Sequence, residues 1–298
     1  MDQPAAPAPR LTTRPFSQVN VFSAEPLAGN PVAVVHAADG VAEEQMAAFA
    51  RWTNLSETTF LLTPTDPAAD YRLRIFTPGG ELPFAGHPTL GSAHAWLVAG
   101  GRPATEGRVA QECAAGLITL RLEQGDGRAH DAGRLAFAAP PLARSGPVDP
   151  ADVDRALTEV GLEQTDLVDA AWVDNGPGWM GLLLTDAEAV LRAASQAGSE
   201  LKIGLVGPHR SVAAPADVEV RAFVPGLGIP EDPVTGSLNA GLAQWLIGAG
   251  RLPARYVAAQ GTALARAGRV HVEQDATDPE TIWVGGDCVT VLDGTVRM

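Results

Sequence analysis

Apolar and polar residues alternate over many short segments of the chain, and Gly, Pro and Asp separate these segments. Alternation of this kind, with many β-branched residues, is typical of short β-strands. In the first half of the chain we expect strands over residues 19–22, 31–35, 58–62, 71–76 and 117–122. In the second half we expect strands over residues 135–138, 182–184, 218–224, 269–273 and 281–284.

Helical patterns are fewer, and two of them are unusual. We expect helices over residues 42–52, 88–98, 151–160, 186–197 and 237–247. The helices at 88–98 and 237–247 are apolar on nearly every side and rich in Ala and Gly. A helix without a polar face is buried, and small side chains allow strands to pack closely around it. We therefore expect two sheets, each curled around a central helix.

One long motif occurs twice. The stretch from Arg74 to Arg102 and the stretch from Arg221 to Arg251 both begin with Arg-x-Phe-x-Pro-Gly. Both then pass through a Gly-rich turn into an apolar helix that contains Trp-Leu near its end. A fainter repeat relates residues 29–35 to residues 178–184. The spacing is about half of the chain, far longer than the period of a solenoid. The repeat therefore indicates two homologous halves.

These patterns predict an α+β protein with two pseudo-symmetric halves. We expect residues 1–14, rich in Ala and Pro, to be a mobile tail. The N-terminal half is predicted to span residues 15–128, with the last strand, 288–298, as a candidate to complete it. The C-terminal half is predicted to span residues 129–287, after a linker near residues 125–131.

In each copy of the motif a Gly-containing turn opens directly into the buried helix, at residues 85–89 and 234–238. The first amides of a helix have no partner within the helix, and together with the helix dipole they favour an anion. Two such helix starts facing one cleft would bind a small carboxylate without a cationic side chain. The alternative is that the Ser and Thr residues there simply cap the helices.

Composition limits the choice of partners. The 298-residue chain has a formal net charge of −14, which disfavours nucleic acid and anionic membranes as partners. No apolar run approaches the length of a membrane span, and the two cysteines, Cys113 and Cys288, have no metal-binding or redox spacing. The six histidines are scattered, so no metal site is expected. We expect a cytoplasmic protein.

Four ordered motifs, at residues 19–35, 54–60, 84–89 and 231–237, resemble those of the PhzF family, the phenazine-biosynthesis isomerase and its relatives. The resemblance implies a diaminopimelate epimerase-like fold, with each half a sheet or barrel around a central helix and the active site between the halves. It further implies a homodimer that shifts a proton within a dihydro-hydroxyanthranilate ring without a cofactor.

By this resemblance Glu57, His87 and Asp232 are the catalytic residues. Glu57, in Asn-Leu-Ser-Glu, corresponds to the acid/base that carries the proton. A carboxyl group shielded from water, with a raised pKa, can take a proton from one carbon and return it to another. His87 and Asp232 correspond to residues that hydrogen-bond the polar groups of the substrate.

The resemblance also implies a set of residues that bind the substrate. Gly86, Gly236 and Ser237, at the helix starts, are expected to bind its carboxylate. Asn20 and Ser56 are weaker candidates for the lining of the pocket.

Two other functions remain open. The first is an epimerase that uses carboxylate bases. Racemases of this fold with two thiols are disfavoured, because Ala85 and Asp232 occupy roughly the positions of those thiols. The second is a protein that binds a small carboxylate without turnover. The sequence departs from the usual family pattern at Val234 and Leu238, which leaves the identity of the substrate open.

Overall fold

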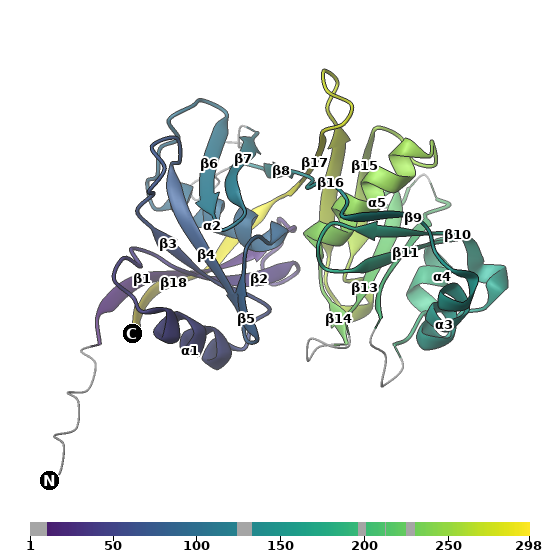
Figure 1. Cartoon of the computed structure of the whole chain (residues 1–298), viewed down its shortest axis with the longest axis horizontal. Coiled ribbons are helices and arrows are strands. Elements are labelled where there is room, and N and C mark those ends of the chain that lie inside the picture. The colour runs from purple at the N-terminus through teal and green to yellow at the C-terminus, as the bar shows by residue number, and fades with distance from the viewer. Residues whose placement is uncertain (1–10, 124–132, 196–200, 212, 225–229) are drawn as a thin grey trace, which may run out of the picture.

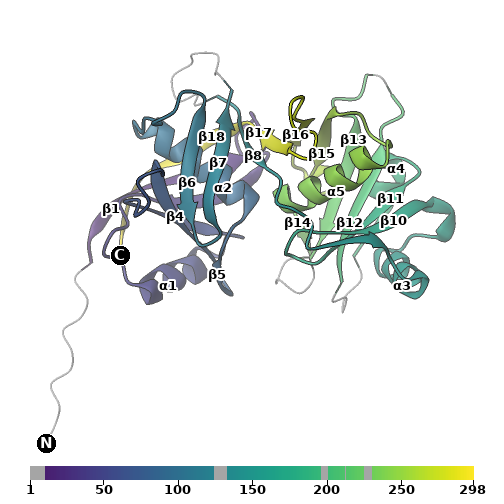
Figure 2. The same cartoon turned by 45° about the horizontal axis from the view of Figure 1, so that its top comes forward.

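The computed structural model describes residues 11–123, 133–195, 201–211, 213–224 and 230–298, and its strands form two curled sheets joined edge to edge (Figures 1 and 2). The helices are α1 (Glu43–Thr53), α2 (Gly86–Val98), α3 (Pro150–Val160), α4 (Ala187–Arg192) and α5 (Gly236–Gly248). The strands are β1 (Thr13–Val21), β2 (Asn30–Val35), β3 (Thr58–Leu62), β4 (Tyr71–Thr77), β5 (Gly80–Leu82), β6 (Arg108–Cys113), β7 (Gly116–Leu122), β8 (Leu135–Ala138), β9 (Arg144–Pro147), β10 (Leu167–Asp174), β11 (Trp179–Leu184), β12 (Lys202–Pro208), β13 (Val218–Phe223), β14 (Glu231–Asp232), β15 (Arg255–Gln260), β16 (Gly268–Gln274), β17 (Ile282–Gly286) and β18 (Cys288–Arg297).

Strand pairing links both halves into one continuous sheet. Its order, from one edge to the other, is β18-β1-β2-β3-β4-β6-β7-β8-β17-β16-β15-β13-β12-β11-β10-β9, and the short strands β5 and β14 add to β4 and β13. The predicted fold class is confirmed: each half curls around its own apolar helix, α2 in the first and α5 in the second (Figure 1).

Small residues on the two central helices allow this close wrapping. A side chain at Gly91 in α2 would collide with Val21 and Val32 on the first sheet, and one at Gly241 in α5 would collide with the backbone of Val173 on the second. A single apolar cluster includes Leu90 of α2 and Leu242 of α5 together with the strands around them. The buried helices expected from their all-round apolar pattern are therefore confirmed.

The repeated Arg-x-Phe motif has the same structural role in both halves. The guanidinium of Arg74 lies 5.0 Å from the ring centroid of Phe76 and pairs with Glu81 on β5. The guanidinium of Arg221 lies 4.7 Å from the ring centroid of Phe223 and pairs with Glu231 on β14. In each copy the ion pair of the arginine therefore links a long strand to the short strand that precedes the central helix.

The helix predicted over 186–197 is shorter than expected, because α4 ends at Arg192. Arg221 explains this end in part, since its Nη1 donates to backbone carbonyls at the end of α4, including that of Ala193. Helices α3 and α4 lie at the outer end of the second half (Figure 1), over an apolar cluster of their own.

The chain ends return to the first half. β18 pairs antiparallel with β1 along its length, from Thr13 opposite Arg297 to Val21 opposite Cys288. β1 begins at Thr13, inside the range predicted as a tail. Its partner strand lies 267 to 284 residues further along the chain, so the residues near Thr13 carry no local signal of this pairing. Residues 1–10 and the predicted linker at 125–131 lie outside the described residues.

Several strands were not predicted, namely β5, β6, β9, β10, β12, β14 and β15, whereas β18 lies within the range expected for the last strand, 288–298. Most are short, or interrupted by Gly, Pro or charged residues, so alternation is weak. Both cysteines are free and buried, in β6 and at the start of β18. Among the described residues, no helix has both the length and the apolar character that crossing a membrane requires.

Candidate active site

The starts of the two central helices meet at the junction of the halves. A Cβ built on Gly86, the first residue of α2, would lie 3.4 Å from the Cα of Gly236, the first residue of α5. The same Cβ would lie 2.7 Å from the ring of Phe137, and one on Gly236 would lie 3.3 Å from that ring. Glycine is therefore required for the two helix starts to approach each other and Phe137 this closely.

Neither central helix has a side-chain cap at its start. The side chains of the N-cap residues Ala85 and Thr235 accept no hydrogen bond from the helix amides. By contrast, Asp149 and Asp186 cap α3 and α4 with their carboxylates. The first amides of α2 and α5 are thus left without the usual side-chain acceptor, and they favour a bound anion. This contrast disfavours the alternative that the turn residues only cap the helices.

Glu57 and His87 meet beside these helix starts, although they come from different elements. Glu57 ends the loop before β3, and His87 is the second residue of α2. Glu57 Oε2 lies 3.2 Å from His87 Nε2, and the two side chains are only 15% and 6% exposed. Neither atom has a hydrogen bond of good geometry among the described residues. A bound molecule is therefore a suitable partner for both.

Asp232 joins the same cluster from the second half. Its Oδ1 accepts a hydrogen bond of 3.1 Å from Asn30 Nδ2, and its Oδ2 accepts one of 2.6 Å from the Thr235 hydroxyl. Asn30 Nδ2 also lies 3.5 Å from His87 Nδ1. The structure thus brings together Glu57, His87 and Asp232, which the sequence separates by up to 175 positions.

Burial shifts the pKa values of all three groups. Removal from water raises the pKa of Glu57 to about 8, and the negative charge of Asp232 contributes to the rise. Burial lowers the pKa of His87 to about 3, although a hydrogen bond with the carbonyl of Pro31 acts in the opposite direction. At neutral pH the Glu57–His87 contact is therefore mainly between an uncharged carboxyl group and an uncharged imidazole.

The pKa of Asp232 is raised less, to about 6. Burial again causes the rise, while the hydrogen bonds from Thr235 and Asn30 oppose it because they stabilise the carboxylate. Asp232 is therefore mostly ionised at neutral pH, whereas Glu57 is mostly protonated. Two carboxyl groups with separated pKa values are an arrangement suited to acid and base chemistry.

Ser237, the second residue of α5, has a hydrogen-bond partner in the second half. The indole Nε1 of Trp179 donates to its hydroxyl oxygen at 3.0 Å. A hydroxyl group that accepts this bond keeps its own proton for another acceptor. Ser237 is therefore oriented to donate to an anion at the start of α5.

The two other residues expected to line the pocket, Asn20 and Ser56, have different surroundings. The amide of Asn20 is buried, donates to the carbonyls of Ser23 and Glu25, and accepts from the amide of Gly29. These bonds hold the loop between β1 and β2, which favours a structural role over the predicted contact with a substrate. Ser56 is partly buried and directly precedes Glu57 in the chain.

Three buried polar residues of the cluster were not predicted from the sequence: Asn30, Thr235 and Gln260. The side chain of Gln260 accepts from the Thr235 amide and donates to the Asp232 carbonyl, so it supports the turn before α5. Asn30 lies inside the repeated segment 29–35, and Thr235 lies in the repeated turn at 234–238, whereas no sequence pattern pointed to Gln260.

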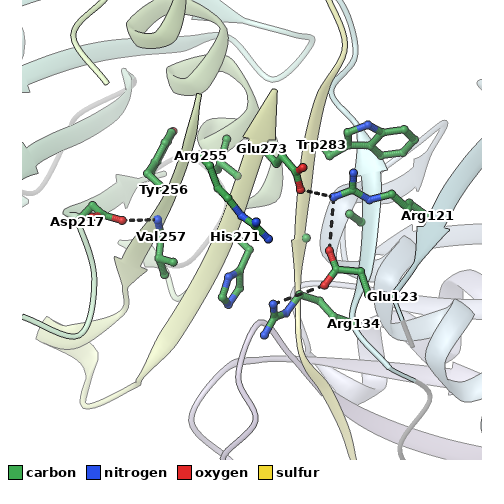
Figure 3. Close-up of a pocket in the computed structure, with 13 residues that line it drawn as sticks. Arg121, Glu123, Arg134, Asp217, Arg255, Tyr256, Val257, His271, Glu273 and Trp283 are labelled. Carbon is green, nitrogen blue, oxygen red and sulfur yellow. Dashed lines mark hydrogen bonds and ion pairs between the residues drawn. The ribbon is translucent and has the colours of Figure 1, made fainter. Parts of the chain in front are cut away.

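Two cavities lie away from this cluster. One, of about 200 Å³, is on the face of the sheet where β7 and β8 meet β15–β17 (Figure 3). There Arg121 of the first half lies between Glu123 and Glu273, 2.7 Å from the latter, and Arg134 faces Glu123 (Figure 3). These paired charges connect the halves. The other cavity, of about 350 Å³, lies beside β9 and β10.

Glu57 and His87 are nearly enclosed, with 15% and 6% of their side chains exposed. Within the described parts of the chain, no group of three or more His, Cys, Asp or Glu side chains is arranged to bind a metal ion.

Comparison with known proteins defines the class of the protein. A family model described as phenazine biosynthesis-like protein matches residues 19–294. The chain belongs to this family, PhzC-PhzF. Among relatives, it is 32% identical to antisense-enhancing sequence 1 of Schizosaccharomyces pombe, over 95% of this chain and 99% of the relative. It is also 32% identical to an uncharacterized isomerase of Pasteurella multocida, over 94% and 93% of the two chains.

A shorter match has a more specific name. Over 110 residues, 37% of this chain and 38% of the relative, the chain is 46% identical to trans-2,3-dihydro-3-hydroxyanthranilate isomerase of Pseudomonas aeruginosa.

Solved structures agree with the fold. A PhzF family protein of Bacillus anthracis superposes with a TM-score of 0.80 at 22% identity, over 96% and 100% of the two chains. A predicted epimerase of Pseudomonas aeruginosa superposes with a TM-score of 0.76 at 26% identity, over 95% and 99%.

Proposed function

We propose that the protein is an isomerase that moves a proton between two carbons of a small carboxylate, with Glu57 as the acid/base. The observation that supports this most is the position of Glu57. It is a shielded carboxyl group with a pKa of about 8, beside two uncapped helix starts. A pKa near the working pH allows one group both to take and to return a proton.

Binding comes first in the proposed mechanism. The carboxylate of the substrate accepts hydrogen bonds from the first amides of α2 and α5 and from the hydroxyl of Ser237. The net charge of −14 does not prevent this binding, because the helix ends supply a local positive potential. Fixing the carboxylate in this way places the carbon skeleton beside Glu57.

Proton transfer follows in two steps. Ionised Glu57 removes a proton from one carbon, and the electron pair of the broken C–H bond moves into the adjacent unsaturated system. Protonated Glu57 then delivers a proton to a second carbon, and the double bond shifts. In D₂O, exchange of the Glu57 carboxyl proton with solvent between the two steps places deuterium at that carbon. No atom is gained or lost, so the sum of the two steps is an isomerisation that leaves Glu57 ionised, as it began.

His87 and Asp232 assist in different ways. His87 is uncharged at neutral pH, so it offers a hydrogen bond without adding a positive charge that would hold Glu57 ionised. Asp232, mostly ionised, accepts a hydrogen bond from an amino or hydroxyl group of the substrate. Its negative charge also helps to keep the pKa of Glu57 high.

For the substrate, we propose trans-2,3-dihydro-3-hydroxyanthranilate or a close analogue. The support is the 46% identity with the Pseudomonas aeruginosa isomerase of that name. In this substrate class a carboxylate, an amino group and a hydroxyl group surround the carbons that exchange the proton, which suits the helix starts and Asp232.

The test is an NMR assay with this compound in D₂O, using wild-type protein and two variants. Glu57→Gln is expected to abolish both product formation and deuterium incorporation at carbon. Glu219→Gln is a matched control, because Glu219 is also buried and also has a raised pKa, but it contacts His209 instead of the cluster. Turnover that survives in Glu57→Gln would remove Glu57 from its role.

One observation favours an epimerase as a second candidate. Glu57 and Asp232 come from opposite halves, as the two bases of an epimerase do, and both have raised pKa values. An epimerase would invert a chiral centre without shifting a double bond, so chiral chromatography of candidate amino acids distinguishes the two reactions. The predicted homodimer is likewise a proposal, which sedimentation of the purified protein tests.

A further inference from the structure

Asn30 connects the two halves at the centre of the cluster. It is the first residue of β2, and its side chain is fully buried. Its Nδ2 lies 3.1 Å from Asp232 Oδ1 and 2.9 Å from the carbonyl oxygen of Val234, both in the second half. The same nitrogen lies 3.5 Å from His87 Nδ1 in the first half.

The surroundings determine the orientation of this amide. The carbonyl oxygen of Val234 is always an acceptor, and an oxygen of ionised Asp232 is also an acceptor and never a donor. A flipped amide would place its own oxygen against both of them, and three acceptors would then repel one another. The NH₂ group of Asn30 therefore faces the second half, with one hydrogen for each acceptor.

The other half contains a similar arrangement. Trp179 is the first residue of β11, as Asn30 is of β2, and both strands contain six residues. Trp179 Nε1 donates to Ser237, the second residue of α5, while Asn30 contacts His87, the second residue of α2. In both halves, the residue that starts this strand contacts the second residue of the central helix.

We propose that Asn30 is a positioning residue that holds the Asp232 carboxylate in place beside His87 and Glu57. Its importance for catalysis rests on the proposed function, whereas its hold on Asp232 does not. Asn30 acts through the Asp232 side chain, and its amide donates to this carboxylate in the other half. It therefore also fixes how the halves meet at the site.

A hydrogen bond from Asn30 stabilises the ionised form of Asp232, so its loss raises the pKa of Asp232 above about 6. The other groups that act on Asp232 are Thr235, which also donates to it, and the nearby acids Glu57 and Glu231. Glu231 is paired with Arg221 at 2.6 Å, and replacement of Asn30 removes no atom of this pair.

NMR of protein with ¹³C-labelled carboxyl groups measures the pKa of Asp232 without any substrate. Asp232→Asn identifies the signal. Asn30→Ala and Asn30→Leu, the second of similar volume, are expected to raise its midpoint. Thr235→Val, which removes the other donor, is expected to do the same. Gln244→Ala is the matched control, because it removes a partly buried amide that donates to the carbonyl of Pro140, and it is expected to leave the midpoint unchanged.

A second measurement needs no variant that weakens the fold. In the wild-type protein, the side-chain ¹⁵N signal of Asn30 is expected to shift with pH with a midpoint near 6, following Asp232. An Asp232 midpoint that stays constant in folded Asn30 variants, or an Asn30 signal insensitive to pH between 5 and 7, would overturn the proposal. Loss of turnover in Glu57→Gln is a separate result, so failure of the proposed function is distinguishable from failure of this role.

Discussion

Replacement of Glu57 by Gln is expected to stabilise the folded protein at alkaline pH. In the folded protein the pKa of Glu57 is about 8, against an ordinary value of 4.5. Between these values the folded state holds the proton and the unfolded state releases it. The wild-type protein therefore has its full stability from this group below about pH 4.5 and loses it as the pH rises through about 8.

The size of this stability difference follows from the pKa shift of Glu57. A rise from 4.5 to about 8 corresponds to about 5 kcal/mol of differential free energy between folded and unfolded states. Because domains have total stabilities of roughly 5–15 kcal/mol, even half of this effect is measurable. Gln has nearly the same shape as a protonated Glu and does not ionise. The two proteins should therefore be similarly stable near pH 4.5, and Glu57→Gln should be more stable by a few kcal/mol at pH 9.

Urea unfolding followed by tryptophan fluorescence, at intervals from pH 4.5 to pH 9, measures this difference. Glu106→Gln, at an exposed position, is the control, and its difference from wild type should not grow with pH. If the difference for Glu57→Gln also stayed constant, Glu57 would not be a shielded acid, and its proposed role as proton carrier would lose its physical basis.

Three further predictions concern the cluster and its supports. Asp232→Asn removes the charge that raises the pKa of Glu57, so the acidic limb of the kcat/KM profile should move to lower pH, and an unmoved limb would contradict the coupling. Gly86→Ala, which forces a Cβ against Phe137, should lower stability by about 1–3 kcal/mol and weaken carboxylate binding in calorimetry. Gly248→Ala, in open space at the other end of α5, should do neither. Arg221→Ala should cost about 3–5 kcal/mol in unfolding experiments, because it leaves Glu231 buried without its partner. Arg74→Ala, in a more exposed pair, should cost about 1 kcal/mol or less, and equal losses would refute the argument from burial.

Much of the fold could be predicted from the sequence where the signal is local and repeated. The all-round apolar pattern located α2 and α5 to within two residues, and the double motif indicated the two halves. Strands that depend on distant partners gave no such signal. Five of the ten residues of β18 are exposed, and Asp293 and Gly294 interrupt its apolar residues. The pairing with β1, not a local pattern, defines this strand.

The candidate site was predictable to a similar extent. The resemblance to a known family pointed to Glu57, His87 and Asp232, and the structure brings them together. Their roles stay predictions. Asp232 and Leu82 occupy equivalent positions in the two halves. Asp232 on β14 is paired with Ala222 on β13, and Leu82 on β5 is paired in the same way with Ile75 on β4. The repeat therefore preserved the scaffold and changed the chemistry in one half.

Hydrogen bonds between distant residues could not be predicted. Asn20 and Asn30 are both buried asparagines in the same motif, and the sequence gives no reason to prefer one over the other. Only the structure shows that Asn20 bonds to its own loop, whereas Asn30 reaches Asp232 across the junction of the halves.

A crystal structure with a bound carboxylate, obtained with 3-hydroxyanthranilate as a stable analogue, tests the central claim most directly. We expect the carboxylate to contact the first amides of α2 and α5 and the Ser237 hydroxyl, with ring carbons facing Glu57. A ligand held instead in the cavity lined by Arg121 and Arg255, with Glu57 and Asp232 untouched, would contradict the account.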